Sequence, residues 1–170
     1  MTRPTWDETW LAVASVVSER SLCDRDRVGA VIVDRANRIV STAYNGPPAG
    51  FVETRGLTNP ARCSMWCSRA TNGVETILDE QAGEVRGLQP DYSDCPSLHA
   101  EANALSVCDR SLREDGTIYV TSHVCGGCAK LVANSGLARV VVRPSASADH
   151  RRSEDWYTFL RHCRVLVSVM

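Results

Sequence analysis

The sequence predicts an α/β protein, a three-layer α/β/α sandwich in which helices cover both faces of a mixed five-stranded sheet. Three observations carry this prediction. Short runs rich in β-branched and apolar residues indicate buried strands. Segments with apolar residues at helical spacing indicate helices. The two kinds of segment alternate along the chain, as they do in layered α/β domains.

The first helix is expected to begin at a capping box. Thr5 is a favourable N-cap residue, and Glu8 stands three residues later, where its carboxylate can reach back to the Thr5 backbone. The helix is predicted to end between residues 18 and 20. Apolar residues at helical spacing predict its buried face: Trp6, Trp10, Val13 and Val17.

A β-hairpin is predicted next. Residues 28–33 form an uninterrupted apolar run, which indicates a buried strand. Residues 34–37 have the composition of a turn, and residues 38–44 predict the second strand. Residues 45–50 contain two prolines and two glycines, so a loop is expected there.

Residues 51–97 show little periodicity, and a connection of this length is unusual within a compact domain. We therefore expect one domain over residues 1–170 with an insertion at about 51–97, and a short helix within the insertion at 76–84. The remaining elements follow the insertion. Helices are predicted at 99–110, 125–134 and 154–163, and strands at 117–121, 139–143 and 164–169.

Composition and charge weigh against several classes of protein. The chain has 170 residues, no apolar stretch long enough to span a membrane, and no N-terminal apolar run typical of a signal peptide, so a cytoplasmic protein is expected. Its net charge of −1 and aromatic content of 6% weigh against a nucleic-acid partner, because such proteins usually carry a basic excess. In a reducing compartment its eight cysteines are expected to be metal ligands or packed thiols.

Two short motifs contain the chemically active residues. The first is His99-Ala100-Glu101, and the second is Cys125-Gly126-Gly127-Cys128. One imidazole and two thiolates are three suitable ligands for zinc, with a fourth position left open for water. The carboxylate of Glu101 beside them is a candidate to move protons on that water.

The predicted helices explain part of this site. Cys125 and Cys128 share one face in the first turn of a helix, where the backbone N–H groups and the helix dipole lower thiol pKa values. His99 opens another helix, so two helix N-termini would meet at one metal. Glu101 is harder to place, because residues two apart on a helix point about 200° away from each other. Both could reach one site only in a first turn that lies against a neighbouring element.

Together the motifs match the signature of zinc-dependent nucleobase deaminases. The chain resembles the cytidine/deoxycytidylate deaminase superfamily, and within it the deoxycytidylate (dCMP) deaminases. Four stretches carry the resemblance: residues 20–33 (RSLCDRDRVGAVIV), 39–50 (IVSTAYNGPPAG), 99–105 (HAEANAL) and 125–131 (CGGCAKL). One departure is Val124, where the family usually has a proline before the first cysteine.

The resemblance implies a cytidine deaminase-like fold and zinc-dependent hydrolysis of dCMP to dUMP and ammonia in pyrimidine nucleotide metabolism. The residues that it assigns are three zinc ligands, one carrier of protons and three substrate contacts: His99, Cys125 and Cys128; Glu101; and Asn45, Arg25 and Ala100. It further implies a homo-oligomer, a hexamer in many members, and in some members activation by dCTP and inhibition by dTTP.

The resemblance also implies a second, structural zinc, which some bacterial and phage members carry. Four thiolates would close such a site and anchor the insertion: Cys23, Cys63, Cys67 and Cys95. The alternative is that these residues are packed thiols. Cys108 and Cys163 lie on helix patterns and are expected in the core.

Three other functions stay open. The substrate could be another or a modified cytosine nucleotide or nucleoside. A deaminase of tRNA or single-stranded DNA would need a basic channel with stacking aromatic residues, which the composition does not favour. A non-catalytic zinc module would have no use for the carboxylate of Glu101.

Overall fold

The structure is a computed structural model, and it describes residues 2–21, 23, 26–48, 95, 97–144 and 154–170, together with the backbone of 76–79 and 84–87. The chain divides into two compact units. Met1–Ser21, Arg27–Asn45 and His99–Met170 form the sheet unit, and Leu22–Asp26 and Gly46–Leu98 form the insertion unit. A single domain with an insertion stays a prediction.

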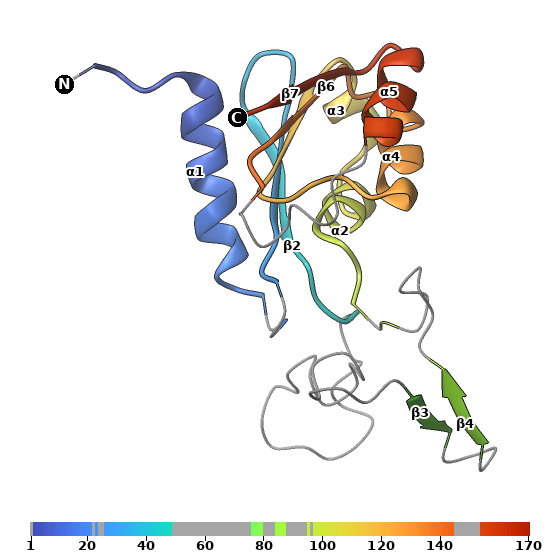
Figure 1. Ribbon diagram of the computed structural model, residues 1–170. Helices are drawn as coiled ribbons and strands as arrows, with labels where there is room; N and C mark the ends of the chain where they lie inside the picture. Colours follow the sequence, from blue (N-terminus) through green and yellow to red (C-terminus); the bar gives the residue numbers. More distant parts are fainter. Residues whose placement is uncertain are drawn as a thin grey trace. The chain divides into compact units, whose positions relative to one another are not determined.

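The sheet unit contains a mixed sheet of five strands, as the sequence predicts (Figure 1). The strand order is β2-β1-β5-β6-β7. Strand β1 pairs antiparallel with both β2 and β5, whereas β5–β6 and β6–β7 are parallel pairs. The strand bounds are β1 Gly29–Val33, β2 Ile39–Tyr44, β5 Thr117–Val120, β6 Arg139–Val142 and β7 Leu166–Val169.

Helices lie on both faces of this sheet, which confirms the three-layer sandwich (Figure 1). Helix α1 (Trp6–Ser18) covers one face; α2 (Ala100–Ser106), α4 (Gly126–Ala133) and α5 (Glu154–His162) cover the other, and the short α3 spans Arg110–Arg113.

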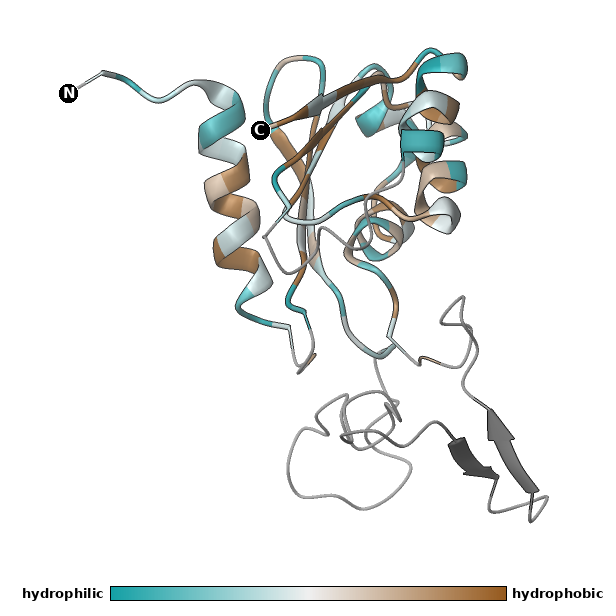
Figure 2. Ribbon diagram, viewed as in Figure 1, coloured by the Kyte–Doolittle hydropathy of each residue, from teal (hydrophilic) through white to brown (hydrophobic). Residues whose placement is uncertain are grey.

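Two hydrophobic clusters explain the layers. Side chains alternate along a strand, so each strand serves both faces. Val31 and Tyr119 pack with α1, whereas their neighbours Ile32 and Val120 pack with the helices on the opposite face. Figure 2 shows hydrophobic residues along β6 and β7, and hydrophobic and hydrophilic residues alternating along α1.

Helix α1 is fixed by its first turn. The predicted capping box is confirmed, since the Thr5 hydroxyl accepts from the Glu8 backbone at 3.2 Å and the Glu8 carboxylate accepts from the Thr5 backbone at 2.7 Å. Asp7 forms an ion pair with Arg139 at 2.7 Å and accepts a hydrogen bond from the Tyr119 hydroxyl at 2.9 Å. The hydrogen bond from Arg139 holds the pKa of Asp7 below its ordinary value.

The predicted buried face of α1 is partly wrong. Trp6 is 55% exposed and stacks on Trp10, with ring centroids 5.3 Å apart. The fully buried residues of the helix are Leu11 and Ala14. A Cβ added to Gly29 would lie 1.9 Å from the Ala14 carbonyl oxygen, so the close approach of α1 to β1 at this point determines which side of the helix faces the sheet.

The insertion unit corrects a second prediction. The helix expected at 76–84 is instead a pair of antiparallel strands, β3 (Thr76–Asp79) and β4 (Glu84–Gly87). A nine-residue helix would be marginal by itself, and the β-branched residues at 76, 77 and 85 favour strands.

Two further predictions concern Cys108 and Cys163. Cys108 is buried as expected, but Cys163 is exposed, because α5 ends at His162 and the chain turns through Arg164 at a φ of 64°.

Within the part of the chain that the structure describes, no helix has the length and apolar character needed to cross a membrane.

Candidate active site

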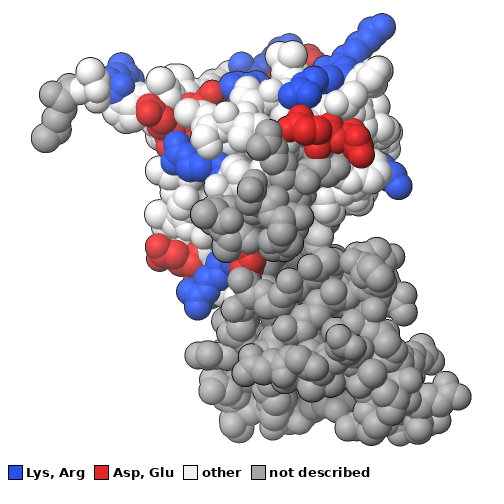
Figure 3. Space-filling view, in the orientation of Figure 1, with Lys and Arg blue, Asp and Glu red and all other residues white. Residues whose placement is uncertain are grey.

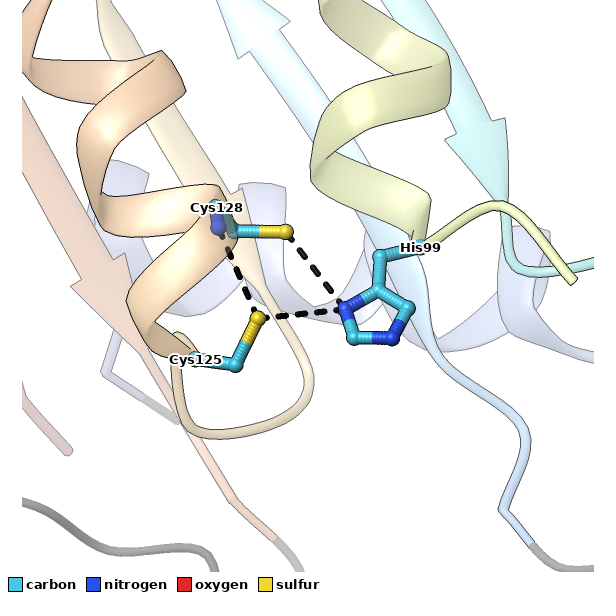
Figure 4. A group of neighbouring side chains, drawn as sticks. All are labelled: His99, Cys125 and Cys128. Atoms are coloured by element: carbon cyan, nitrogen blue, oxygen red, sulfur yellow. Dashed lines mark hydrogen bonds between the residues drawn. The ribbon is translucent and has the colours of Figure 1, made fainter. Parts of the chain in front are cut away.

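Two helix N-termini build the site. His99 is the N-cap of α2 and Cys125 is the N-cap of α4, and both have extended backbones, with ψ angles of 150° and 168°. Cys128 lies in the first turn of α4. The three side chains point toward one another from the two helix ends (Figure 4). The predicted convergence of two helix N-termini is therefore confirmed.

The distances between these side chains suit one metal ion. Nδ1 of His99 lies 3.3 Å from Sγ of Cys125 and 3.5 Å from Sγ of Cys128. All three donor atoms lie within 4.8 Å of one another, so the group could hold a metal ion. A tetrahedral zinc with ordinary Zn–N and Zn–S bonds places nitrogen and sulfur about 3.6 Å apart. The donor set fits zinc in both chemistry and spacing.

The pKa values of the two cysteines are shifted in opposite directions. Hydrogen bonds from the Cys128 thiol and from His99 hold the pKa of Cys125 well below its ordinary value, and the Cys128 backbone N–H, 3.5 Å from the Cys125 sulfur, acts in the same direction. The pKa of Cys128 is raised, because its thiol donates to Cys125 and is buried. The pair thus favours one thiolate, and thiolates are the form of cysteine that binds zinc.

Glu101 lies in the first turn of α2, beside this group. Its side chain is only 3% exposed, and burial raises its pKa above the ordinary value. The Cys128 thiol is close enough to hydrogen-bond to its carboxylate. The spacing problem disappears because His99 precedes the helix, so the angular separation of helical residues does not apply to the pair.

Asn45 and Ala100 are the described residues among the predicted substrate contacts. Asn45 is buried, and its Oδ1 accepts hydrogen bonds from the Ser21 hydroxyl at 2.7 Å and the Val28 backbone at 2.8 Å. These bonds fix the end of β2 against the start of β1. Ala100 is fully buried at the start of α2. Their contacts with substrate stay predictions.

Among the other predicted site residues, the structure describes two, Cys23 and Cys95. Cys23 and Cys95 are partly buried, and both belong to the insertion unit although they lie far apart in the sequence. Arg25, Cys63 and Cys67 lie outside the described residues.

His123 is a residue near the site that no motif in the sequence singles out. This residue is buried two positions before Cys125, and its Nδ1 shares a hydrogen bond of 2.6 Å with the Tyr157 hydroxyl. The only signal in the sequence is an ionisable residue within an otherwise uncharged segment that leads to a metal ligand. Its partner comes from the C-terminal helix, which no local pattern connects to this segment.

In this three-layer sandwich, two helix N-termini bring one histidine and two cysteines together beside a buried glutamate. This combination is characteristic of the zinc-dependent deaminases. The family model described as "Cytidine and deoxycytidylate deaminase zinc-binding region" matches residues 4–143. The chain belongs to this cytidine and deoxycytidylate deaminase family.

Relatives with sequence similarity support the assignment. The chain is 40% identical over 141 residues to the deoxycytidylate deaminase of Mycobacterium phage D29, which covers 83% of this chain and 96% of the relative. It is 35% identical over 145 residues to that of Enterobacteria phage T4, covering 78% and 75%. The structure is also similar to the crystal structure of the dCMP deaminase of cyanophage S-TIM5 in complex with dCMP and dUMP. The superposition covers 100% of both chains with a TM-score of 0.62 and 22% sequence identity, which shows that the two proteins share the fold.

Proposed function

We propose that this protein hydrolyses dCMP to dUMP and ammonia, with zinc held by His99, Cys125 and Cys128. The observation that carries the proposal is the convergence of these three donors beside a buried carboxylate. The choice of dCMP follows the D29 and T4 phage relatives, both named deoxycytidylate deaminases, at 40% and 35% identity. The S-TIM5 enzyme, which shares the fold, binds both the proposed substrate and the proposed product.

The reaction assigns a clear task to Glu101. Zinc held by these three donors would act as a Lewis acid and lower the pKa of a water molecule to about 7. Glu101 carries one proton of the water to ring N3 and the other to the amino group, while the oxygen stays on C4 and ammonia leaves. The buried position of Glu101 raises its pKa, so that its carboxyl can hold a proton during this transfer.

A substrate panel tests the proposal. We expect ammonia release and loss of cytosine absorbance with dCMP, and much slower reaction with CMP, deoxycytidine and cytosine. The panel should include dCMP with modified bases, because the sequence leaves that variant open. Faster reaction with deoxycytidine or cytosine than with dCMP would contradict the nucleotide assignment.

Polynucleotide substrates belong in the same panel as the rival hypothesis. On the face shown in Figure 3, basic and acidic side chains are interspersed, and the whole chain has a net charge of −1. A strand-binding channel is usually basic. We therefore expect no ammonia release from tRNA or single-stranded DNA under conditions where dCMP is consumed.

We further propose a second, structural zinc at Cys23, Cys63, Cys67 and Cys95. Support comes from the four-thiolate chemistry and from the shared position of Cys23 and Cys95 in the insertion unit. Metal analysis of protein kept reduced should give two zinc ions per chain, and Cys23→Ser should reduce this to one. A wild-type value of one would contradict the second site.

Two finer points of this proposal rest on the resemblance to dCMP deaminases: assembly into a homo-oligomer, and control by dCTP and dTTP. A third point, a cytoplasmic location, rests on the composition of the sequence. A reducing cytoplasm would keep Cys125 and Cys128 available as metal ligands. Repeating the dCMP assay with each triphosphate tests the regulatory part.

A further inference from the structure

The C-terminal helix α5 lies beside the segment that carries the cysteine ligands. Helix α5 packs against α4, and its residues share a hydrophobic cluster with Val124 and Cys128. The family model ends at residue 143, so α5, which begins at Glu154, lies outside the matched region. The contact is therefore a feature of this chain that the family match does not describe.

Tyr157 of α5 holds the segment on one side of Cys125. Its side chain is 1% exposed, and its hydroxyl shares the 2.6 Å hydrogen bond with Nδ1 of His123. His123 is 6% exposed, so both partners are removed from water. A buried hydrogen bond is costly to break, because bulk water cannot reach the two atoms to replace it. The bond thus restricts the backbone two residues before the ligand.

Trp156 holds the segment on the other side of Cys125. A Cβ added to Gly126 would lie 2.3 Å from Cζ2 of Trp156, so the indole ring rests directly on the backbone that follows the ligand. The ring is itself positioned by Phe159, edge-on with centroids 6.0 Å apart, and by the Lys130 ammonium at 5.6 Å from its centroid. Only glycine at position 126 permits this contact.

These two contacts lie on either side of Cys125 along the chain. Val124 stands immediately before the ligand, and valine leaves φ free, whereas proline would fix it. We propose that Trp156 and Tyr157 are positioning residues that hold residues 123–126 in the conformation in which Cys125 binds zinc. This inference rests on the proposed zinc site, and it assigns part of the support of that site to α5.

The test is the rate of zinc release from the holoprotein to a chromogenic chelator. Loss of a group that hydrogen-bonds directly to a metal ligand typically costs 10–100-fold in metal affinity. Tyr157 bonds to His123, two residues before the ligand, so its effect should lie at the lower end of that range. We expect Tyr157→Phe to release the catalytic zinc about tenfold faster than wild type. Tyr119→Phe is the control, because it also removes one hydrogen-bonded tyrosine hydroxyl, here a partly buried one that bonds to Asp7 on the opposite face of the sheet. It should release zinc at the wild-type rate.

Thermal unfolding of both variants separates general destabilisation from an effect on the metal. Equal release from Tyr157→Phe and Tyr119→Phe, or faster release from both in proportion to their lost stability, would overturn the inference. If Tyr157→Phe does not fold, Trp156→Leu takes its place with Leu160→Ala as control, since Leu160 is buried on the same helix. A wild-type protein that binds no zinc would overturn the proposed function, and this inference with it.

Discussion

Replacing Glu101 with glutamine should lower kcat for dCMP by about 10³-fold while the protein keeps its zinc. Glutamine has nearly the same shape as glutamate and can occupy the same buried position, but it can neither accept nor deliver a proton. The side chain is 3% exposed, so bulk water has little access to replace it as a carrier. Steady-state kinetics and metal analysis on the same preparation give both quantities.

Glu114→Gln is the matched control for this experiment. The Glu114 side chain is 57% exposed and pairs loosely with Arg110 at 3.8 Å, so the same chemical change there should leave kcat unaltered. A Glu101→Gln protein that keeps more than a tenth of the wild-type kcat, with full zinc content, would show that another group carries the proton.

Replacing Cys128 with alanine should remove one zinc per chain and lower deamination by at least about 10³-fold, because Lewis-acid assistance contributes several kcal/mol to such a reaction. Cys128 is one of three donors within 4.8 Å of one another, and a site that already uses only three protein ligands has none to spare. The measurements are zinc content and ammonia release at saturating dCMP.

The chain provides a close control for this substitution in Cys108→Ala. Both thiols are buried, both belong to the same hydrophobic cluster, and neither change adds bulk. Both variants should lose some stability through the cavity that the missing sulfur leaves. Only Cys128→Ala should lose metal, and zinc loss from Cys108→Ala would argue against the assigned ligand set.

The layers of the fold could be predicted because the residues of each strand show by themselves whether the strand is buried on one face or on both. Val31 and Ile32 are both apolar, since strand β1 is buried on both faces, and that pattern alone indicates a central strand. The buried face of α1 was harder to predict from the sequence. Trp6 follows the helical spacing of the apolar residues but is exposed, because the contact between Ala14 and Gly29 determines the orientation of the helix.

The site shows the same division between local and tertiary information. His99, Cys125 and Cys128 were identified from spacing and ligand chemistry, and the structure brings them together. The way in which Glu101 shares the site with His99 depends on the extended backbone of an N-cap residue, which the spacing did not reveal. The contact of Tyr157 with His123 joins residues 34 positions apart, and no periodicity predicts it.

The placement of the metal donors also makes the stability of the folded protein depend on the concentration of free zinc. The donors come from the ends of two helices, with His99 and Cys125 separated by 26 positions along the chain, so a bound ion acts as a cross-link that the unfolded chain lacks. By mass action, each tenfold rise in free zinc above saturation adds about 1.4 kcal/mol to the free energy of unfolding. Zinc starvation would therefore reduce the amount of folded enzyme in addition to its loaded fraction.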